Sequence, residues 1–455
     1  MNEISSRRPE EAGHTAALQG LRVGMVSLGC TKNRVDSEIA LGALQDAGCQ
    51  FTRQPAEADI LMVNTCGFIN PAKVESIDTI LEMSAYKKTG RCRLLVVTGC
   101  LAQRYEGELM QDLPEIDLLM GVNQYHLLPQ AVAEALAGKR QSLCGQNTMF
   151  FEQRRVLTTP GYTAYTRIGD GCSNRCTFCA IPLIRGNYRS RRMGDILQEL
   201  ELLSQRGVRE HILVAQDTTR YGRDWQDASA LAELMERAAE VPGVDWLRVL
   251  YCYPDGTDER LLDVLARNPK ACPYLDLPIQ HINDALLRRM ARRGTSGDIR
   301  RIIAAARDRG LTLRTSIIVG FPGETEVQFQ ELLDFLQEAQ FDRLGAFAYS
   351  PEEDTPAAVM PDQIDEEVKQ ERLHRLMTLQ GDISLKRNMA RVGETVEVLV
   401  TDRDAQGNCL GRSRREAPEM DGEIRFTARE LPDLGTMVQV RLTAAEMYDL
   451  KGERV

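Results

Sequence analysis

Three cysteines in one short loop have the spacing of a metal-cluster site. Cys172, Cys176 and Cys179 lie in the run GCSNRCTFC, with no fourth cysteine and no histidine close behind them. Structural zinc sites use four protein ligands, and iron–sulfur cubanes are normally held by four thiolates. Three thiolates at this spacing leave one iron of a 4Fe–4S cluster open, which indicates a reactive cluster. The alternatives are a zinc loop and three unrelated core cysteines.

A second set of three cysteines follows three predicted strands near the N-terminus. The apolar runs LRVGMVSL, ADILMVN and RLLVVT end shortly before Cys30, Cys66 and Cys100, with helical patterns at 37–47 and 71–83 between them. Such runs are typical of buried parallel strands, whose carboxyl ends line one edge of a sheet. We therefore expect a second three-thiolate site there, although any one of these cysteines alone is better explained as a buried strand-end residue. The other cysteines show no such register and are interpreted as packing or surface residues: Cys49, Cys92, Cys144, Cys252, Cys272 and Cys409.

The elements that position the first loop are strands and helices that alternate along the middle of the chain. Their pattern, with amphipathic helices such as 195–205, predicts six parallel βα units and hence a partial barrel. The expected strands are Ala164–Ile168, Ile212–Ala215, Leu247–Tyr251, Tyr274–Leu277, Leu313–Val319 and Leu344–Ala348. The loop of three cysteines follows the first of them, at the strand end where barrels place their chemistry.

Length and composition indicate several domains with reduced thiols. A chain of 455 residues is too long for one ordinary domain. No stretch approaches the ~18 to 20 apolar residues of a membrane span, and no export signal is visible, so the cysteines point to metal ligation in the cytoplasm. The expected organisation is α/β: a disordered leader at 1–20, an open parallel-sheet domain at 21–138, a linker at 139–160, the partial barrel at 161–389 and a small antiparallel β-barrel at 390–455.

The loop with Cys172, Cys176 and Cys179 resembles the cluster loop of the radical S-adenosylmethionine enzymes. In that superfamily the open iron binds the amino and carboxylate groups of S-adenosylmethionine, and electron transfer from the cluster releases a 5′-deoxyadenosyl radical. The resemblance implies cofactor contacts at the strand ends. They are Phe178 near the adenine, Gln216 near the methionine amino group, and Gln280 and Gly320 near ribose and adenine.

Two three-thiolate sites in one chain resemble the methylthiotransferases. The motifs SLGCTKNRVDSE, PLIRGNYRSR, VAQDTTRYG, YLDLPIQHIND and EAPEMDG resemble the RimO family over nearly the whole chain, with one small departure in IGDGCSNRC. That family adds a methylthio group to the β-carbon of an aspartate in ribosomal protein S-12. The resemblance implies two 4Fe–4S clusters, one for the radical and one for sulfur delivery, and two molecules of S-adenosylmethionine per turnover. A sulfur source and an electron donor are further implied partners.

The C-terminal segment resembles the TRAM domain and carries an unexpected charge. Runs such as TVEVLV and MVQVRL predict a small β-barrel. Residues 391–455 contain 10 Lys and Arg against 13 Asp and Glu, and the whole chain has a net charge of −10. A barrel that binds phosphates is expected to be basic, so the charge favours a basic ribosomal protein over nucleic acid as the main partner. We expect Asp402, Asp404, Glu419 and Asp421 to form part of a docking surface for it.

Two other functions stay open on the sequence. One is a tRNA adenosine methylthiotransferase, which the acidic barrel disfavours. The other is a non-catalytic iron–sulfur or zinc module that docks on ribosomes, which metal analysis would separate from an enzyme.

The roles of several polar residues near the strand ends also stay open. Arg185 and Arg189 are either partners of the target carboxylate or ion-paired structural residues. His281 is either part of the cofactor site or a structural residue at the end of its strand. The helix 365–389 is expected to connect the two barrels, with these side chains directed inward: Val368, Leu373, Leu376 and Leu379.

Overall fold

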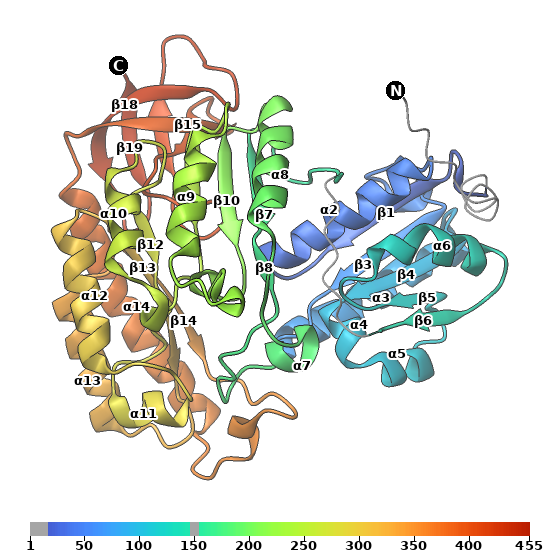
Figure 1. Cartoon of the computed structure of the whole chain (residues 1–455), viewed down its shortest axis with the longest axis horizontal. Helices are drawn as coiled ribbons and strands as arrows, with labels where there is room; N and C mark the ends of the chain where they lie inside the picture. The colour runs from blue at the N-terminus through green and yellow to red at the C-terminus, as the bar shows by residue number, and fades with distance from the viewer. Residues whose placement is uncertain (1–16, 146–153) are drawn as a thin grey trace.

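The computed structural model describes residues 17–145 and 154–455 of the chain. Figure 1 shows an N-terminal α/β part beside a central barrel, with a smaller barrel packed at one end of the central one. Most of the leader expected at 1–20 lies outside the described residues. Residues 17 and 18 are helical and 19–20 form a turn; Leu18 is buried, so the packed part of the chain already includes them.

The N-terminal part is a six-stranded sheet with the order β2-β1-β3-β4-β5-β6, in which every pair is parallel. Its strands are β1 (Arg22–Ser27), β2 (Gln50–Phe51), β3 (Ile60–Thr65), β4 (Leu94–Gly99), β5 (Leu118–Met120) and β6 (Gln141–Leu143). Its helices are α2 (Thr31–Asp46), α3 (Asn70–Thr89), α4 (Cys100–Arg104), α5 (Glu106–Asp112) and α6 (Leu128–Leu136). Successive strand residues point to opposite faces of the sheet. Met62 and Val63 therefore pack in two different hydrophobic clusters, one on each face.

Two expectations about this part need correction. Helix α2 begins at Thr31, not at 37, because its first turn buries polar side chains such as Lys32, Asn33 and Asp36 that conceal the apolar pattern. The segment 139–160, expected to be a linker, contains the edge strand β6. Beyond it, the buried Arg155 pairs with Glu38 of α2 at 2.8 Å, so the connection is fixed to the fold.

The central part is a partial barrel of six parallel strands, as predicted. The strands form two sheets, β11-β10-β7 and β12-β13-β14, joined by a bridge between Leu247 and Ala271. They are β7 (Thr163–Arg167), β10 (Glu210–Val214), β11 (Trp246–Val249), β12 (Tyr274–Asp276), β13 (Thr312–Val319) and β14 (Arg343–Ala348). The helices are α7 (Ile181–Arg185), α8 (Met193–Gln205), α9 (Ala230–Glu240), α10 (Glu259–Arg267), α11 (Asp284–Arg289), α12 (Ser296–Asp308), α13 (Glu326–Ala339) and α14 (Glu366–Met389). A short pair, β8 (Gly169–Asp170) with β9 (Arg189–Ser190), flanks the cysteine loop and α7.

The C-terminal part is a closed five-stranded barrel with the order β15-β16-β17-β19-β18. Its strands are β15 (Thr395–Arg403), β16 (Cys409–Arg412), β17 (Ile424–Thr427), β18 (Met437–Ala445) and β19 (Leu450–Arg454). All neighbours pair antiparallel except β17 and β19, which are parallel. Helix α14 leads into it from the central barrel. Leu376 of that helix is buried, but Val368 is 39% exposed, so the expectation that Val368 points inward is wrong.

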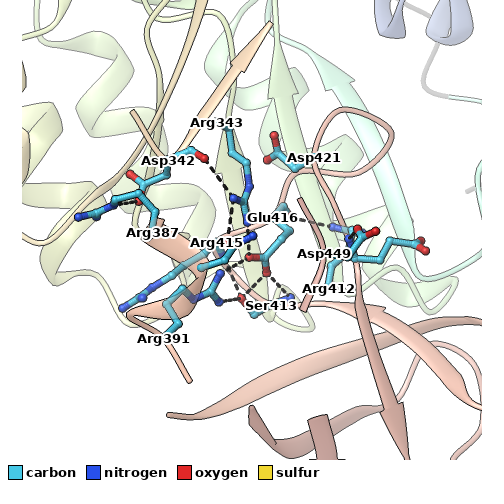
Figure 2. Close-up of polar contacts among 12 residues, drawn as sticks. Asp342, Arg343, Arg387, Arg391, Arg412, Ser413, Arg415, Glu416, Asp421 and Asp449 are labelled. Atoms are coloured by element: carbon cyan, nitrogen blue, oxygen red, sulfur yellow. Dashed lines mark hydrogen bonds and ion pairs between the residues drawn. The ribbon is translucent and has the colours of Figure 1, made fainter. Parts of the chain in front are cut away.

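The small barrel closes the amino-terminal end of the central barrel through buried charges (Figure 2). Glu416 pairs with Arg391 at 2.5 Å and with Arg343 at 3.3 Å, and Ser413 donates to it at 2.6 Å. Arg343 begins β14, so these contacts lie at the opposite end from the loops that follow the strands. None of the helices in the described ranges has the length and apolar character needed to cross a membrane.

Candidate active site

The loop from 171 to 180 carries Cys172, Cys176 and Cys179 between β8 and α7. The Cys172 amide donates to Gly186 O at 3.0 Å, and the Cys179 amide donates to Cys176 O at 3.0 Å. Thr177 donates from its amide to Met290 O at 3.1 Å. Backbone hydrogen bonds on both sides therefore fix the loop at the carboxyl-terminal end of the central barrel, as the order of elements predicted.

Burial dominates the electrostatics of this loop. It raises the pKa of Cys172 to about 11 and raises that of Cys179 well above the ordinary thiol value. The guanidinium of Arg292 lies 3.9 Å from Cys176 Sγ and stacks over the Tyr253 ring, 4.1 Å from its centroid. The thiols of Cys172 and Cys179 are therefore protonated without metal, and a bound metal would displace their protons.

The three N-terminal cysteines follow neighbouring strands and come together at one sheet edge. Cys30 follows β1, Cys66 follows β3 and Cys100 follows β4. A methyl group built on Gly29 would lie 3.2 Å from Cys66 Sγ, so the loop before Cys30 packs directly on Cys66. Asn33 joins the three ends, because it donates to Thr65 O at 2.9 Å and its Oδ1 lies 3.4 Å from Cys100 Sγ.

The thiols of this second set interact electrostatically with one another and with the cations Lys32 and Arg185. Burial raises the pKa of Cys66, and burial together with repulsion from the thiolates of Cys30 and Cys66 raises that of Cys100 to about 12. Burial also acts to raise the pKa of Cys30, but Lys32, the backbone of Asn33 and Arg185 together bring it below the usual value. The edge therefore combines three mutually close thiols with a positive field.

Arg185 connects the two sets of cysteines. It ends α7, directly after the first cysteine loop, yet its Nη2 lies 3.6 Å from Cys100 Sγ. Nη2 also donates to Asp36 at 2.6 Å, and Nη1 donates to Asp170 at 3.0 Å. With 1% of its surface exposed, Arg185 is fully engaged inside the protein. The expectation that it binds a substrate carboxylate is therefore wrong, and its role as an ion-paired structural residue is the correct one.

Arg189 lies differently. Its side chain is 31% exposed and its Nη2 is 3.9 Å from Asp170 Oδ2. Its role toward a substrate stays a prediction.

Within the described ranges, no group of three or more His, Cys, Asp and Glu side chains is close enough to hold a single metal ion. A cubane separates its cysteine ligands by iron and sulfide atoms, so it needs a wider spacing than one ion does. The remaining cysteines lie outside both sets; all are buried except the half-buried Cys144, which agrees with a packing role. None of the twelve cysteines forms a disulfide.

The residues expected to contact S-adenosylmethionine lie at the strand ends of the central barrel. Gln216 follows β10, donates to Asp170 Oδ1 at 3.3 Å, and has a buried Oε1 without a hydrogen-bond partner. Phe178 packs on the apolar cluster that contains Phe321 and Tyr349. The contacts of Gln216 and Phe178 with S-adenosylmethionine stay predictions.

Gln280 and Gly320 have structural reasons for their conformation. Gln280 adopts a φ of 70°, and its backbone exchanges hydrogen bonds with Ser316 and Ile318 of β13. Gly320 adopts a φ of 69°, and a Cβ there would lie 2.3 Å from Lys369 Cγ. Contact with a cofactor is not required to explain either conformation.

His281 is held in place by its backbone neighbours and by burial. It is buried, and its Nδ1 accepts a hydrogen bond from the Asn283 amide at 3.0 Å. Burial, reinforced by the charge of Arg372, lowers its pKa to about 3, so the imidazole is neutral at neutral pH. These contacts support the structural role, and its Nε2, 3.6 Å from Glu324 Oε2, has no hydrogen-bond partner in the described chain.

The four acidic residues expected to dock a partner are not one surface. Asp402 is exposed, and Glu419 pairs with Arg34 of α2 at 3.1 Å. Asp404 accepts hydrogen bonds from the amides of Gln406 and Asn408 and so holds the β15–β16 turn. Asp421 is buried and accepts a hydrogen bond from the Tyr274 hydroxyl at 2.7 Å, so its inclusion in a docking surface is wrong.

Sequence patterns missed the buried polar residues that join the two cysteine sets. Lys32, Asn33 and Asp36 lie on one helical turn, three of the polar letters in the motif SLGCTKNRVDSE. Asp36 accepts hydrogen bonds from Arg167 and Arg185, Asn33 accepts one from Arg185, and both arginines belong to the central barrel. The motif contained the signal, but the partners could be paired only in three dimensions.

Three family models match the three parts of the chain. "Uncharacterized protein family UPF0004" matches residues 22–121, "Radical SAM superfamily" matches 166–336 and "TRAM domain" matches 392–455. The chain is 49% identical to the ribosomal protein uS12 methylthiotransferase RimO of Heliobacterium modesticaldum, over 97% of each chain. It is 49% identical to the RimO of Pelotomaculum thermopropionicum over 96% of this chain and all of that one, and 47% identical to a Clostridium botulinum RimO over 96% and 98%.

This chain belongs to the RimO family. The central fold recurs in solved structures of much lower identity. The radical S-adenosylmethionine methyltransferase TsrM of Kitasatospora setae is similar with a TM-score of 0.56 at 16% identity, over 75% of this chain and 74% of that one. That likeness shows the fold. Family membership establishes a radical S-adenosylmethionine enzyme, which implies a 4Fe–4S cluster and S-adenosylmethionine.

Proposed function

We propose that this chain is a methylthiotransferase that replaces a β C–H bond of an aspartate in ribosomal protein uS12 by a carbon–sulfur bond to a methylthio group. The names of its relatives support the client and the transferred group. The resemblance stated for the RimO family supports aspartate as the target residue. The β C–H of aspartate has no useful acidity, so a radical route suits it better than base catalysis.

The residues present fit two iron–sulfur clusters. Cys172, Cys176 and Cys179 would hold one cluster. Cys30, Cys66 and Cys100 at the N-terminal sheet edge would hold the other. Soft thiolates suit iron, and three of them would leave one iron of each cluster without a protein ligand. When bound, the clusters would supply an electron for cleavage of S-adenosylmethionine and a site from which sulfur is delivered. A sulfur source and an electron donor of the cytoplasm would complete the reaction.

The observation that carries the proposal is that Arg185, which ends the helix after the first cysteine loop, contacts a thiol of the second set. The distance from its Nη2 to Cys100 Sγ is 3.6 Å. Radical formation and sulfur transfer require two sites that open on the same space, because the same carbon atom reacts with both. The burial of Arg185 between Asp36 and Asp170 holds that geometry.

The chain's own residues would orient and shield the bound groups. The unpaired Oε1 of Gln216 is a free acceptor at a strand end, suited to the ammonium group of a methionine moiety. Phe178 would cover the adenine, and Gln280 and Gly320 would lie near the ribose and adenine. Exclusion of water from this end of the barrel would protect a reactive intermediate.

Mass spectrometry of uS12 and of digested tRNA, from cells with and without this gene, tests the proposal. Loss of a methylthio group from uS12 alone is expected. Loss from tRNA adenosine alone would overturn it and would mean that the acidic C-terminal barrel binds RNA. Complementation with Cys66→Ala should restore no methylthio group; full product from that variant would contradict the role of the N-terminal cysteines.

A further inference from the structure

A bridging segment, residues 349–360 between β14 and α14, is attached to the first cysteine loop. The Ala357 amide donates to Thr177 O at 3.0 Å, and Thr177 belongs to the loop of three cysteines. Ala357 is also part of the buried apolar cluster on which Phe178 of the same loop packs. A polar and an apolar contact therefore fix this segment to the loop.

The same segment contacts the N-terminal part of the chain through Glu352. Glu352 is 2% exposed. Its Oε1 accepts from the Asn70 amide at 3.0 Å and from the Ser350 hydroxyl at 2.8 Å. Its Oε2 lies 3.1 Å from Lys73 Nζ and 3.5 Å from Arg104 Nη1. This buried carboxylate therefore has partners on two N-terminal helices, α3 and α4.

The two helices follow cysteines of the second set. Helix α3 begins at Asn70, shortly after Cys66, and α4 runs from Cys100 to Arg104. Helix α3 has neither a side-chain cap of its own nor an acidic residue in its first turn. The first amides of a helix lack partners within it and favour a negative charge. Glu352 therefore stabilises the start of α3 from 282 positions away along the chain.

Glu352 and Arg185 hold the N-terminal part at different points. Arg185 pairs with Asp36 of α2, whereas Glu352 pairs with residues of α3 and α4. One point of contact limits the distance between two bodies, but two separate points also limit their rotation. Removing the charge of Glu352 would leave Lys73 and Arg104 without the buried carboxylate that they share.

We infer that Glu352 is a positioning residue that orients the second cysteine set toward the first, so that sulfur transfer follows radical formation. The inference rests on the proposed function. A displacement of about 1 Å between reacting groups can cost roughly 100-fold in rate. Radical formation needs only the first cysteine set, to which the segment stays bound through Ala357. Loss of the Glu352 charge should therefore separate the two steps.

The test measures 5′-deoxyadenosine and methylthio-uS12 in the same reaction of the cluster-loaded protein, with dithionite as reductant and sulfide as sulfur source. In Glu352→Gln, 5′-deoxyadenosine should still form, but the amount of methylthio product per 5′-deoxyadenosine should fall by roughly 10- to 100-fold. A loss of folded enzyme would lower both products alike. The ratio therefore separates a positioning role from general destabilisation.

Hydrogen exchange of the metal-free protein gives a second measurement. The amides at the start of α3 should exchange roughly 5-fold faster in Glu352→Gln, the difference between a hydrogen bond to a charged and to a neutral acceptor. Asp354→Asn is the matched control, because it removes the same charge from an exposed residue of the same segment. It should keep both the product ratio and the exchange rates of wild type.

An unchanged product ratio in Glu352→Gln, with wild type modifying uS12, would overturn the inference and leave the proposed function intact. Unchanged exchange at the start of α3 would also overturn it. So would an equal fall of the ratio in Asp354→Asn, because the effect would then come from the charge of the segment and not from the contacts of Glu352. A wild type that cleaves S-adenosylmethionine but never modifies uS12 would overturn the proposed function, and the inference with it.

Discussion

At the residue scale, the centre of this molecule depends on buried charges that neutralise one another. Asp36 accepts from Arg185 at 2.6 Å and from Arg167 at 2.6 Å, and each of these side chains is at most 1% exposed. Removing one partner of such a set leaves the others buried and uncompensated, which is far costlier than the pair's net contribution. The contacts therefore specify one arrangement of the two cysteine sets.

Arg185→Ala is expected to lower the free energy of unfolding of the metal-free protein by about 3 to 5 kcal/mol, because Asp170 and Asp36 lose their shared cation. Urea unfolding measures this. The control is Arg22→Ala, which removes an exposed pair with Glu57 and should cost about 0 to 1 kcal/mol. Equal losses in the two variants would contradict the structural role given to Arg185.

His211 should make stability depend on pH. It is buried, with Nε2 3.0 Å from Ser204 Oγ, and burial with the charge of Arg155 lowers its pKa to about 4. The unfolded chain binds a proton near pH 6.5 and the folded one does not, so the free energy of unfolding falls as pH drops from about 6.5 to about 4. In His211→Gln, the difference in the free energy of unfolding between pH 7 and pH 5 should be about 2 kcal/mol smaller than in wild type. Urea unfolding at the two pH values measures this. His374→Gln, at an exposed position, should behave as wild type; the same pH dependence in both variants would refute this account.

At the element scale, the turns that end the strands decide where the N-terminal cysteines lie. Gly99 ends β4 with a φ of 101°, and a Cβ there would lie 2.3 Å from Asn64 Oδ1 and 2.5 Å from Thr65 O. Helix α4 begins at the next residue, Cys100. Only glycine permits this close approach of β4 to the end of β3.

Gly99→Ala is therefore expected to displace Cys100. Iron content after reconstitution should fall from roughly eight to roughly four atoms per chain, one cubane having been lost, while the loop with Cys172 keeps its iron. Iron and acid-labile sulfide analysis provides the measurement. Gly107→Ala on α5, where an added Cβ meets nothing within 4 Å, should keep full iron content. Unchanged iron in Gly99→Ala would show that Cys100 holds none.

At the scale of the whole molecule, the C-terminal barrel covers the end of the central barrel that is opposite the cysteine loop. Its segment from Glu416 to Asp421 contacts residues that begin strands, such as Arg343 and Tyr274. The acidic character of this barrel is therefore partly a packing feature. Of the four acidic residues expected to dock a client, Asp402 is exposed and stays available for a basic client.

Asp402→Lys is expected to weaken binding of uS12 and to change its dependence on salt, because an exposed charge steers association through a screened field. Binding kinetics at several ionic strengths measure this. Asp421→Asn should instead lower the unfolding midpoint and leave the salt dependence unchanged, because it weakens a buried contact with Tyr274. The steering idea fails if Asp402→Lys shows the wild-type salt dependence.

The sequence alone determined the order of the three parts, the six strands of the central barrel and the two sets of three cysteines. These depend on local information: apolar runs mark buried strands, and parallel strands bring their carboxyl ends to one edge. The motif spacing carried the family resemblance for the same reason. The start of α2 was missed because a turn that buries Lys32 and Asp36 looks like an exposed polar segment.

Which polar residues are exposed and which are paired in the interior depends on contacts between parts of the chain that lie far apart in the sequence. Asp421 and Tyr274 are 147 positions apart, and Arg185 and Asp36 are 149 apart. No periodicity links such positions, because their pairing arises when separate domains pack. The same packing placed Glu352 beside the start of α3, 282 positions away. Whether a charged residue has a structural or a functional role depends on its neighbours in space. Those neighbours cannot be read from the order of residues along the chain.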